Sequence, residues 1–324
     1  VRRYKCTAQA LQRPRQAKQE HFDKQGVARI LQRTSVMAEM FSDRLSALDA
    51  TFLDIETQAA PMHVGGALLF EAEPLLAEDG SLDVDRLRQY VECMLEKTPR
   101  YRQRLEWVPG LRHPVWVDFE RFNISYHLRH TRLPRLGDER SLKRLVGRLF
   151  SQPLDRNHPM WEFWIVEGVD ENTFALVIKV HHCMVDGVGG VELLQALLRP
   201  APDRALQEPK PWSPRPAPTR MRLLRDELEH RARGALQLTS FVPRIAQNLG
   251  AIQKLLRTGL QPGAKTLFTE TDISGYRRFD WIETDLGETK AIKNALGGTI
   301  NDVVVAVTTG AVRRFLTRRG SDPD

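Results

Sequence analysis

The sequence predicts an α/β fold, with a layered domain in residues 41–199 followed by a proline-rich linker and a mainly helical region. Between residues 41 and 199, segments with helical spacing alternate with short apolar segments rich in β-formers, which is typical of helices packed on a sheet. Seven prolines then fall within residues 200–219, a composition typical of a stiff, extended linker. Helical patterns resume beyond this linker.

The helices of the first domain are predicted from apolar residues that recur every three to four positions. They are expected in residues 41–58, 81–99 and 141–154, and Pro99 should stop the second of them. Strands are expected in residues 61–71, 107–119, 160–169 and 173–182, the second of them around a Pro-Gly turn. Gly65 and Gly66 indicate a point where the first strand closely approaches another part of the chain.

The second half of the chain is predicted to be mainly helical. Helical patterns near residues 221–260 break at Pro243, a strand is expected in residues 277–286, and a long amphipathic helix should fill residues 299–320. We therefore expect four parts: a disordered basic extension (1–40), an N-terminal domain (41–199), a linker with connecting helices (200–265) and a C-terminal segment (266–324).

Charge and composition exclude several classes of protein. The net charge is +7, but residues 1–40 hold nine Lys/Arg and three Asp/Glu, and the remainder is nearly neutral. No nucleic-acid partner is therefore expected. The first segment lacks the apolar core of a signal peptide, and we expect the natural start at Met37 or Met40. Three scattered cysteines fit a reducing cytoplasm, and no apolar run is long enough to predict a transmembrane helix.

Two adjacent histidines end the last strand of the first domain, in the sequence VIKVHHCMVDGVGG. Strand side chains alternate between faces, so His181 and His182 should point in opposite directions. His182 shares its face with the bulkier apolar residues Phe174, Ile178 and Val180 and is the better candidate for an enclosed site. A histidine there could take a proton from an alcohol or a thiol.

Other interpretations of the histidine pair remain open at this point. Both histidines could be ordinary core or surface residues. A metal site would use His181, His182 and Asp186, but neighbouring strand histidines diverge and no further ligand clusters with them. Cys183 as a nucleophile would point away from the base if the strand continued.

The segment from His181 to Gly187 fits the HHxxxDG signature, and other segments resemble the bacterial wax ester synthase/acyl-CoA:diacylglycerol acyltransferase family. These are residues 45–66, 155–168 (with the motif Pro159-Met160-Trp161) and 299–316. The resemblance implies the two-layer sandwich of the chloramphenicol acetyltransferase type, with a tunnel between two domains. Because the family continues well beyond this point, we expect the first domain to be complete and the second only begun.

The resemblance also implies roles for individual residues. His182 would be the general base, and His181, Asp186 and Gly187 would support the loop, with Asp186 paired to an arginine. Pro159, Trp161, Asn301 and Asp302 would line the tunnel or the interdomain contact, although Asn301 could instead cap the last helix.

The implied substrates are acyl-CoA, as a co-substrate with no permanently bound cofactor, and diacylglycerol or a long-chain alcohol. Such acceptors imply a cytoplasmic protein at a membrane or lipid-droplet surface, and residues 221–260 could bind that surface or form a bridging helix with a solvated face. The alternatives are an HHxxxDG acyltransferase acting on polyketide or sugar hydroxyls, and an inactive or lipid-binding fragment.

Overall fold

The computed structural model describes residues 43–111, 113–134, 138–185, 198, 208–247, 266–268 and 273–321, with side chains except in residues 234–247. The predicted basic extension lies outside the described residues. The fold is mixed α/β with two sheets, which confirms the predicted fold class. The elements follow the order β1 (Asp43–Arg44), α2 (Ala47–Ile55), β2 (His63–Glu71), η1 (Glu73–Leu75), α3 (Val84–Leu95), η2 (Pro99–Arg102), β3 (Gln103–Trp107), β4 (Pro114–Asp118), α4 (Ile124–His127), β5 (Leu128–Arg132), α5 (Glu139–Ser151), β6 (Trp161–Glu167), β7 (Thr173–His181), η3 (His182–Met184), α7 (Arg220–Gln247), α9 (Leu286–Leu296) and α10 (Ile300–Arg318).

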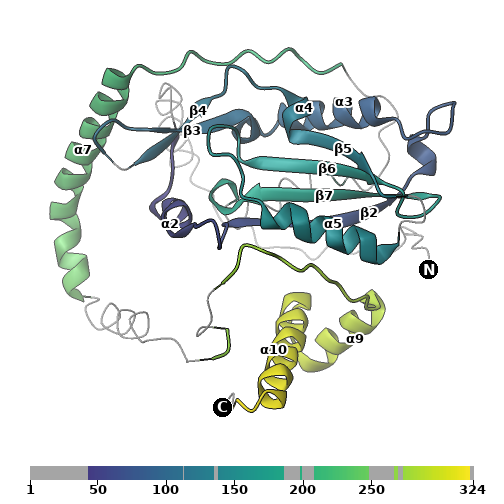
Figure 1. Ribbon diagram of the computed structural model, residues 1–324. Helices are drawn as coiled ribbons and strands as arrows, with labels where there is room; N and C mark the ends of the chain where they lie inside the picture. Colours follow the sequence, from purple (N-terminus) through teal and green to yellow (C-terminus); the bar gives the residue numbers. More distant parts are fainter. Residues whose placement is uncertain are drawn as a thin grey trace, which may run out of the picture. The chain divides into compact units, whose positions relative to one another are not determined.

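The larger sheet has the strand order β2-β7-β6-β5, so β7 is paired along both edges (Figure 1). β7 runs antiparallel to β2 and to β6, whereas β5 and β6 are parallel. The strands predicted around Gly65, Trp161 and the histidine pair are thus confirmed, and the end of β7 is fixed by neighbours on both sides.

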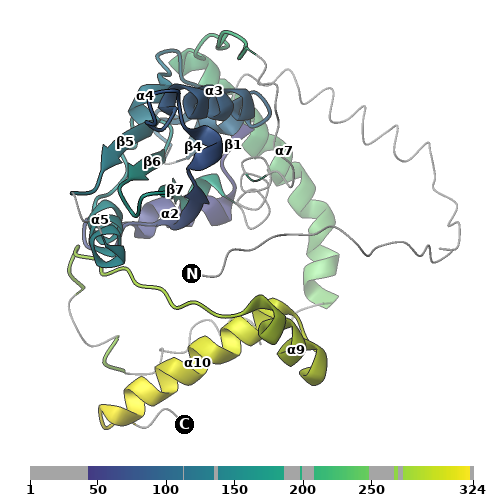
Figure 2. The same cartoon turned by 90° about the vertical axis from the view of Figure 1, so that its right-hand side faces the viewer.

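Each face of this sheet is covered by helices, because apolar side chains on both faces must leave water. Leu142 and Val146 of α5 are fully buried against Val166, Ala175 and Val177 on one face. Residues of α2 and α3 pack into a second cluster with alternate residues of β7 on the other face. In the view turned by 90°, the strands lie between α5 and α3 (Figure 2). A fully buried Leu or Val side chain contributes about 1.5–3 kcal/mol, so these two clusters hold the layers together.

Each of the three predicted helices of this domain begins at a side-chain cap. Ser46, Asp83 and Asp138 accept hydrogen bonds from backbone N–H groups three residues ahead of them, which satisfies donors that the first turn leaves free. The helices at residues 47–55, 84–95 and 139–151 confirm the helical spacing found in the sequence.

Helix α7 packs on the small sheet, whose strand order is β1-β4-β3. Leu223 of α7 is buried against Val108 and Val117, and the buried Glu227 pairs with Arg44 and with Arg231. The helix continues past Pro243, so the predicted break there is wrong; the proline removes one N–H donor without ending the helix. Ion pairs spaced four residues apart follow its outer side, which supports the interpretation of a solvated face in its described side chains.

The proline-rich segment is extended, as predicted, over residues 208–219, but it is fastened to the domain. Arg215 donates two hydrogen bonds to the buried Asp118 carboxylate, from Nε to Oδ2 at 3.0 Å and from Nη2 to Oδ1 at 2.9 Å. Trp212 Nε1 donates to the Phe119 carbonyl at 3.1 Å. These side-chain contacts hold the described part of the linker against the residues that follow β4.

The strand predicted in residues 277–286 is wrong. These residues are extended up to Asp285 but pair with no strand among the described residues, and they dock on α5 through side chains. The Arg277 N–H donates to Ser151 Oγ at 2.8 Å, Lys143 pairs with Asp280 at 2.5 Å, and Phe279 stacks on Phe150 at 5.9 Å. Alternating apolar residues fit such a docked segment as well as they fit a strand.

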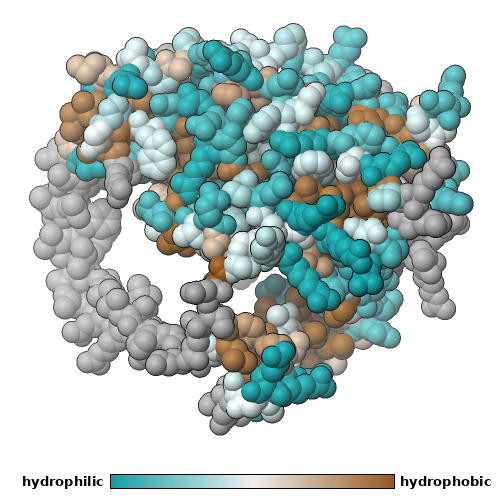
Figure 3. All heavy atoms as spheres, in the orientation of Figure 1, coloured by the Kyte–Doolittle hydropathy of each residue, from teal (hydrophilic) through white to brown (hydrophobic). Residues whose placement is uncertain are grey.

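The described chain ends in two helices, α9 and α10. Gly297 ends α9 in the left-handed conformation at φ 71°, which glycine adopts without strain. The N-cap of α10 is Thr299, which forms a capping box with Asp302, so Asn301 is not the cap. Large apolar side chains stay exposed along both helices (Figure 3), among them Leu296, Val304, Val305, Val307 and Phe315.

Among the described residues, none of the helices alone has the length and apolar composition needed to cross a membrane. Helices α9 and α10 together have the necessary length and composition, but they form a pair bent by 96°.

Gly65 and Gly66 should respond differently to substitution. A Cβ on Gly65 would lie 1.9 Å from the Ile178 oxygen and 2.8 Å from the Phe150 ring, whereas a Cβ on Gly66 meets nothing within 4 Å. Gly65→Ala should therefore lower the free energy of unfolding by about 1–3 kcal/mol, and Gly66→Ala should change it by less than about 0.5 kcal/mol. Urea denaturation of both variants checks this; equal stabilities would contradict the close approach at Gly65.

His127 should make the fold sensitive to acid. Its ring is fully buried between Phe122 and Trp161, and burial lowers its pKa from 6.5 to about 4. Between these values the unfolded chain binds more protons, so the free energy of unfolding falls as the pH drops from about 6.5 to 4. His127→Phe should remove about 3 kcal/mol of that loss. Urea denaturation across this pH range measures it, and an unchanged pH slope would refute the assignment.

Candidate active site

The structure places the two histidines on different elements. β7 ends at His181, and His182 opens the short turn η3, one residue earlier than the strand end predicted from sequence. The His182 N–H donates to the Met62 carbonyl at 2.8 Å, and the Val185 N–H donates to the His182 carbonyl at 3.2 Å. The main chain on both sides of His182 is therefore anchored.

The ring of His182 lies against α2. It stacks on Phe52 with ring centroids 3.8 Å apart and an angle of 19° between the planes. The residue is half-buried, and its Nδ1 is buried without a hydrogen-bond partner among the described residues. Phe52 was predicted as part of a helix but not as a contact of His182, because helical spacing does not say which residue of another element a face will meet.

His181 has a different environment from its neighbour. Its side chain is 1% exposed, and its Nδ1 accepts a hydrogen bond from the Cys183 N–H at 3.1 Å. Its Nε2 lies 3.4 Å from Oε1 of Glu56. Burial lowers the pKa of His181, although the Glu56 carboxylate opposes that shift. A buried, hydrogen-bonded imidazole of this kind is poorly placed to meet a substrate.

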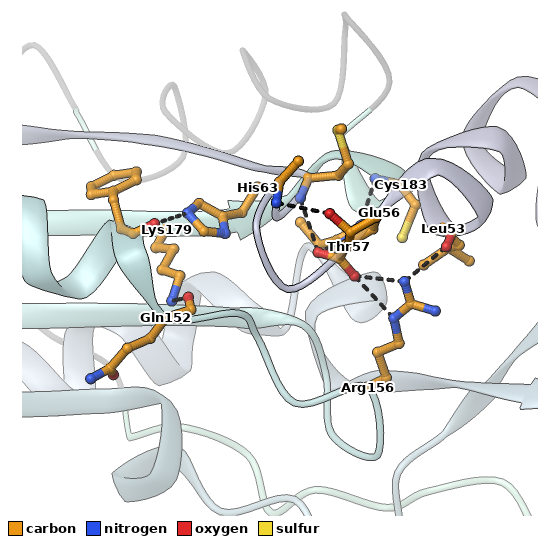
Figure 4. Close-up of polar contacts among 12 residues, drawn as sticks. Leu53, Glu56, Thr57, His63, Gln152, Arg156, Lys179 and Cys183 are labelled. Atoms are coloured by element: carbon orange, nitrogen blue, oxygen red, sulfur yellow. Dashed lines mark hydrogen bonds and ion pairs between the residues drawn. The ribbon is translucent and has the colours of Figure 1, made fainter. Parts of the chain in front are cut away.

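Glu56 and Arg156 complete the surroundings of His181, and neither was predicted from the sequence. Figure 4 shows the guanidinium of Arg156 directed at both Glu56 and the backbone of Leu53. The contacts are 3.0 Å and 2.6 Å to Glu56 Oε2 and 2.8 Å to the Leu53 carbonyl. The two residues are 100 positions apart in the chain, so no local pattern could have paired them.

Cys183 is buried, and burial raises the pKa of its thiol. It therefore stays protonated near neutral pH and is a poor nucleophile. This environment favours chemistry in which the histidine acts directly on a substrate rather than through a neighbouring thiolate.

The remaining predicted site residues are spread over the fold. Trp161 is fully buried in the core, with Nε1 donating to the Tyr101 carbonyl at 2.8 Å, and Pro159 is also buried. Asn301 and Asp302 lie exposed at the start of α10. Asp186 and Gly187, and with them the arginine expected beside Asp186, lie outside the described residues. Among the predicted site residues that the structure describes, His181 and His182 lie together, and Pro159 and Trp161 flank Met160, whose carbonyl accepts the His181 N–H at 2.9 Å.

No group of three or more His, Cys, Asp or Glu side chains that could hold a metal ion occurs among the described residues. Within that part of the chain, His181 faces the carboxylate of Glu56 while His182 faces the ring of Phe52.

Comparison with known proteins identifies the family. Residues 45–304 match the model of the wax ester synthase/diacylglycerol acyltransferase catalytic domain. The chain belongs to the wax ester synthase/diacylglycerol acyltransferase family. A relative from Mycobacterium tuberculosis, provisionally named a diacylglycerol O-acyltransferase, is 34% identical over 295 residues, which cover 87% of this chain and 56% of the relative. A Mycobacterium bovis protein with the same kind of name is 32% identical over 291 residues, which are 87% of this chain and 62% of that protein.

The wax ester synthase/diacylglycerol acyltransferase fold is also seen in a solved structure. The wax ester synthase/diacylglycerol acyltransferase from Marinobacter aquaeolei is similar to this chain with a TM-score of 0.57 and 29% identity, over 86% of this chain and 61% of that one. The chain thus spans a little over half the length of these two curated relatives.

Cys183 should resist alkylation in the native protein. Its thiol is buried and protonated, whereas Cys93 is partly exposed. Iodoacetamide at pH 8, followed by peptide mass spectrometry, should label Cys93 at least about 10-fold faster than Cys183, because the thiolate is the reacting form. Both should react alike after unfolding in urea, and native-state labelling of Cys183 at the rate of Cys93 would contradict its burial.

Proposed function

We propose that the protein, at its natural length, transfers a fatty acyl group from acyl-CoA to the hydroxyl of diacylglycerol or of a long-chain alcohol. The observation that carries this proposal is the half-buried imidazole of His182, anchored at the end of β7 in a chain of this family. The neighbouring His181 is buried, its Nδ1 accepts the Cys183 N–H, and its Nε2 faces Glu56, so His182 is the histidine that a substrate could reach.

In this proposal His182 is the general base. Its imidazole takes the hydroxyl proton as the acceptor oxygen attacks the thioester carbonyl, which gives a tetrahedral oxyanion. The intermediate collapses to the ester, the carbon–sulfur bond breaks, and the coenzyme A sulfur leaves with the proton from His182. No acyl-enzyme is needed, which agrees with the protonated, buried Cys183. Backbone anchoring and the Phe52 stack would hold the imidazole in one orientation for both proton transfers.

The domain organisation forms part of the proposal. Residues 41–199 would supply the histidine wall of the site, residues 200–265 the connection, and residues 266–324 the start of the domain that supplies the opposite wall. Acyl-CoA would be a co-substrate without a permanently bound cofactor. Because the acceptors are membrane lipids, we propose peripheral association with a membrane or lipid-droplet surface on the cytoplasmic side.

Thiol release from palmitoyl-CoA tests this function. Dioleoylglycerol or hexadecanol as the acceptor should stimulate the release, and His182→Ala should lower kcat at least about 100-fold through loss of general-base catalysis. His130→Ala is the matched control, since His130 pairs with Glu167 at the surface and should leave the rate unchanged.

Three outcomes would overturn parts of the proposal. Full activity in His182→Ala would refute the assignment of the base. Stimulation by sugar or polyketide hydroxyls but not by either lipid would refute the substrate class. Lipid binding without thiol release from any acceptor would favour a binding protein.

A further inference from the structure

We propose that Glu56, held by Arg156, is a positioning residue that fixes the tautomer of His181 and thereby the turn that presents His182. The inference rests on the proposed function, because it concerns the orientation of the same base. It concerns contacts that are already formed in the free protein, so it can also be examined without a substrate.

The first step of the argument is the protonation of His181. Its Nδ1 accepts the Cys183 N–H at 3.1 Å, so that nitrogen must carry a lone pair. In a neutral imidazole the proton then sits on Nε2, which faces Oε1 of Glu56 at 3.4 Å. The carboxylate favours a proton on the nitrogen that faces it. The opposite tautomer would place an N–H against the N–H of Cys183.

Among the residues that the structure describes, Glu56 is the carboxylate that faces the His181 ring, with Oε1 3.4 Å from Nε2. His63 and Lys179 belong to the same region of the sheet, but the His63 Nε2 contacts the Phe150 carbonyl at 3.0 Å, and the Lys179 Nζ donates to the Gln152 carbonyl at 2.5 Å. Figure 4 shows these two side chains engaged apart from Glu56. Arg156, His182 and His63, which lies opposite His181 on β2, are further titratable groups that act on His181.

The second step is the way in which Glu56 itself is held. Its Oε1 accepts the Met62 N–H at 2.9 Å, and its Oε2 accepts two N–H groups of the Arg156 fork. Burial by itself raises the pKa of Glu56, but these hydrogen bonds outweigh burial and bring the pKa below its usual value. The group is therefore a fixed, ionised acceptor near neutral pH.

Three chains of contacts connect the Glu56 carboxylate to His182. Met62, which donates to Glu56, accepts the His182 N–H at 2.8 Å through its own carbonyl. Arg156 also donates to the Leu53 carbonyl, next to the Phe52 that stacks on His182. His181 caps the η3 turn that begins with His182. Loss of the charge at Glu56 should therefore move the base without removing any group that touches it.

Glu56→Gln in the natural-length protein tests the inference. The new amide can donate an N–H toward His181 and so favour the wrong tautomer. We expect kcat for thiol release to fall about 10- to 100-fold, the cost of misplacing a catalytic group by about 1 Å. The KM for acyl-CoA should change less than about 3-fold, because the Glu56 side chain is buried and acts in this proposal through His181 rather than on the substrate. Long-range ¹⁵N–¹H NMR of His181 should show the Nε2–H form in the wild type and lose it in the variant.

Asp118→Asn is the matched control. Asp118 has 5% side-chain exposure against 7% for Glu56, and Arg215 forks onto it as Arg156 forks onto Glu56. Both variants should lower Tm to a similar extent, whereas Asp118→Asn should keep kcat within about 2-fold of the wild type, because Asp118 lies on β4 of the other sheet. If Glu56→Gln does not fold, Arg156→Gln should give a smaller loss of kcat in the same direction.

Two results would overturn the inference: a kcat loss in Glu56→Gln no larger than in Asp118→Asn, or an unchanged Nε2–H signal for His181. A wild-type protein that releases no thiol with either lipid would refute the proposed function instead. In that case the NMR comparison alone decides whether Glu56 fixes the tautomer.

Discussion

The pairing of β7 along both edges is the constraint on which the candidate site depends. His181 is opposite His63 on one neighbouring strand, and Val180 is opposite Trp161 on the other, so the last residues of β7 cannot shift in register. A one-residue slip would exchange the two faces of the strand. Because the strand ends at a fixed place, the side chains that leave it reach the same neighbours in every molecule.

The polar groups beneath the sheet show how the fold accommodates charge near its core. Lys179 is fully buried, and its ammonium group has the Gln152 carbonyl and, at 3.9 Å, the Glu162 carboxylate as partners. Glu56 instead has a complete set of donors. An isolated buried charge costs several kcal/mol, so such groups persist where partners surround them. The surroundings of His181 are therefore polar but closed, whereas His182 has an aromatic ring on one face.

Local patterns predicted most elements of the fold, because helical spacing, capping residues and strand alternation are properties of short segments. They identified β7 and the histidine at its end, but His182 lies beyond the strand in η3, so strand alternation does not set the direction of its side chain. They failed where contacts join distant segments: the Glu56–Arg156 pair, the stacking of Phe52 and the fastening of Arg215 to Asp118 cannot be read from spacing. Residues 277–285 were misassigned because docking through Arg277 and Phe279 demands the same alternation as a strand. At α10, Asn301 and Thr299 both suit a cap, and only the backbone geometry distinguishes them.

The docking of Arg277 on α5 has a consequence for the order of events in folding. Its bond to Ser151 closes a loop between residues 126 positions apart, and Gly147 leaves room for the Arg277 carbonyl, which a Cβ there would approach to 2.7 Å. The entropy cost of closing a loop grows only slowly with its length, but a long-range contact is slow to form. Helix α5 and the sheet must already be in place to receive this segment. On a ribosome, the sheet and helices built by residues 43–185 would therefore fold while residues 277–281 are still being made, and these later residues would then pack on α5.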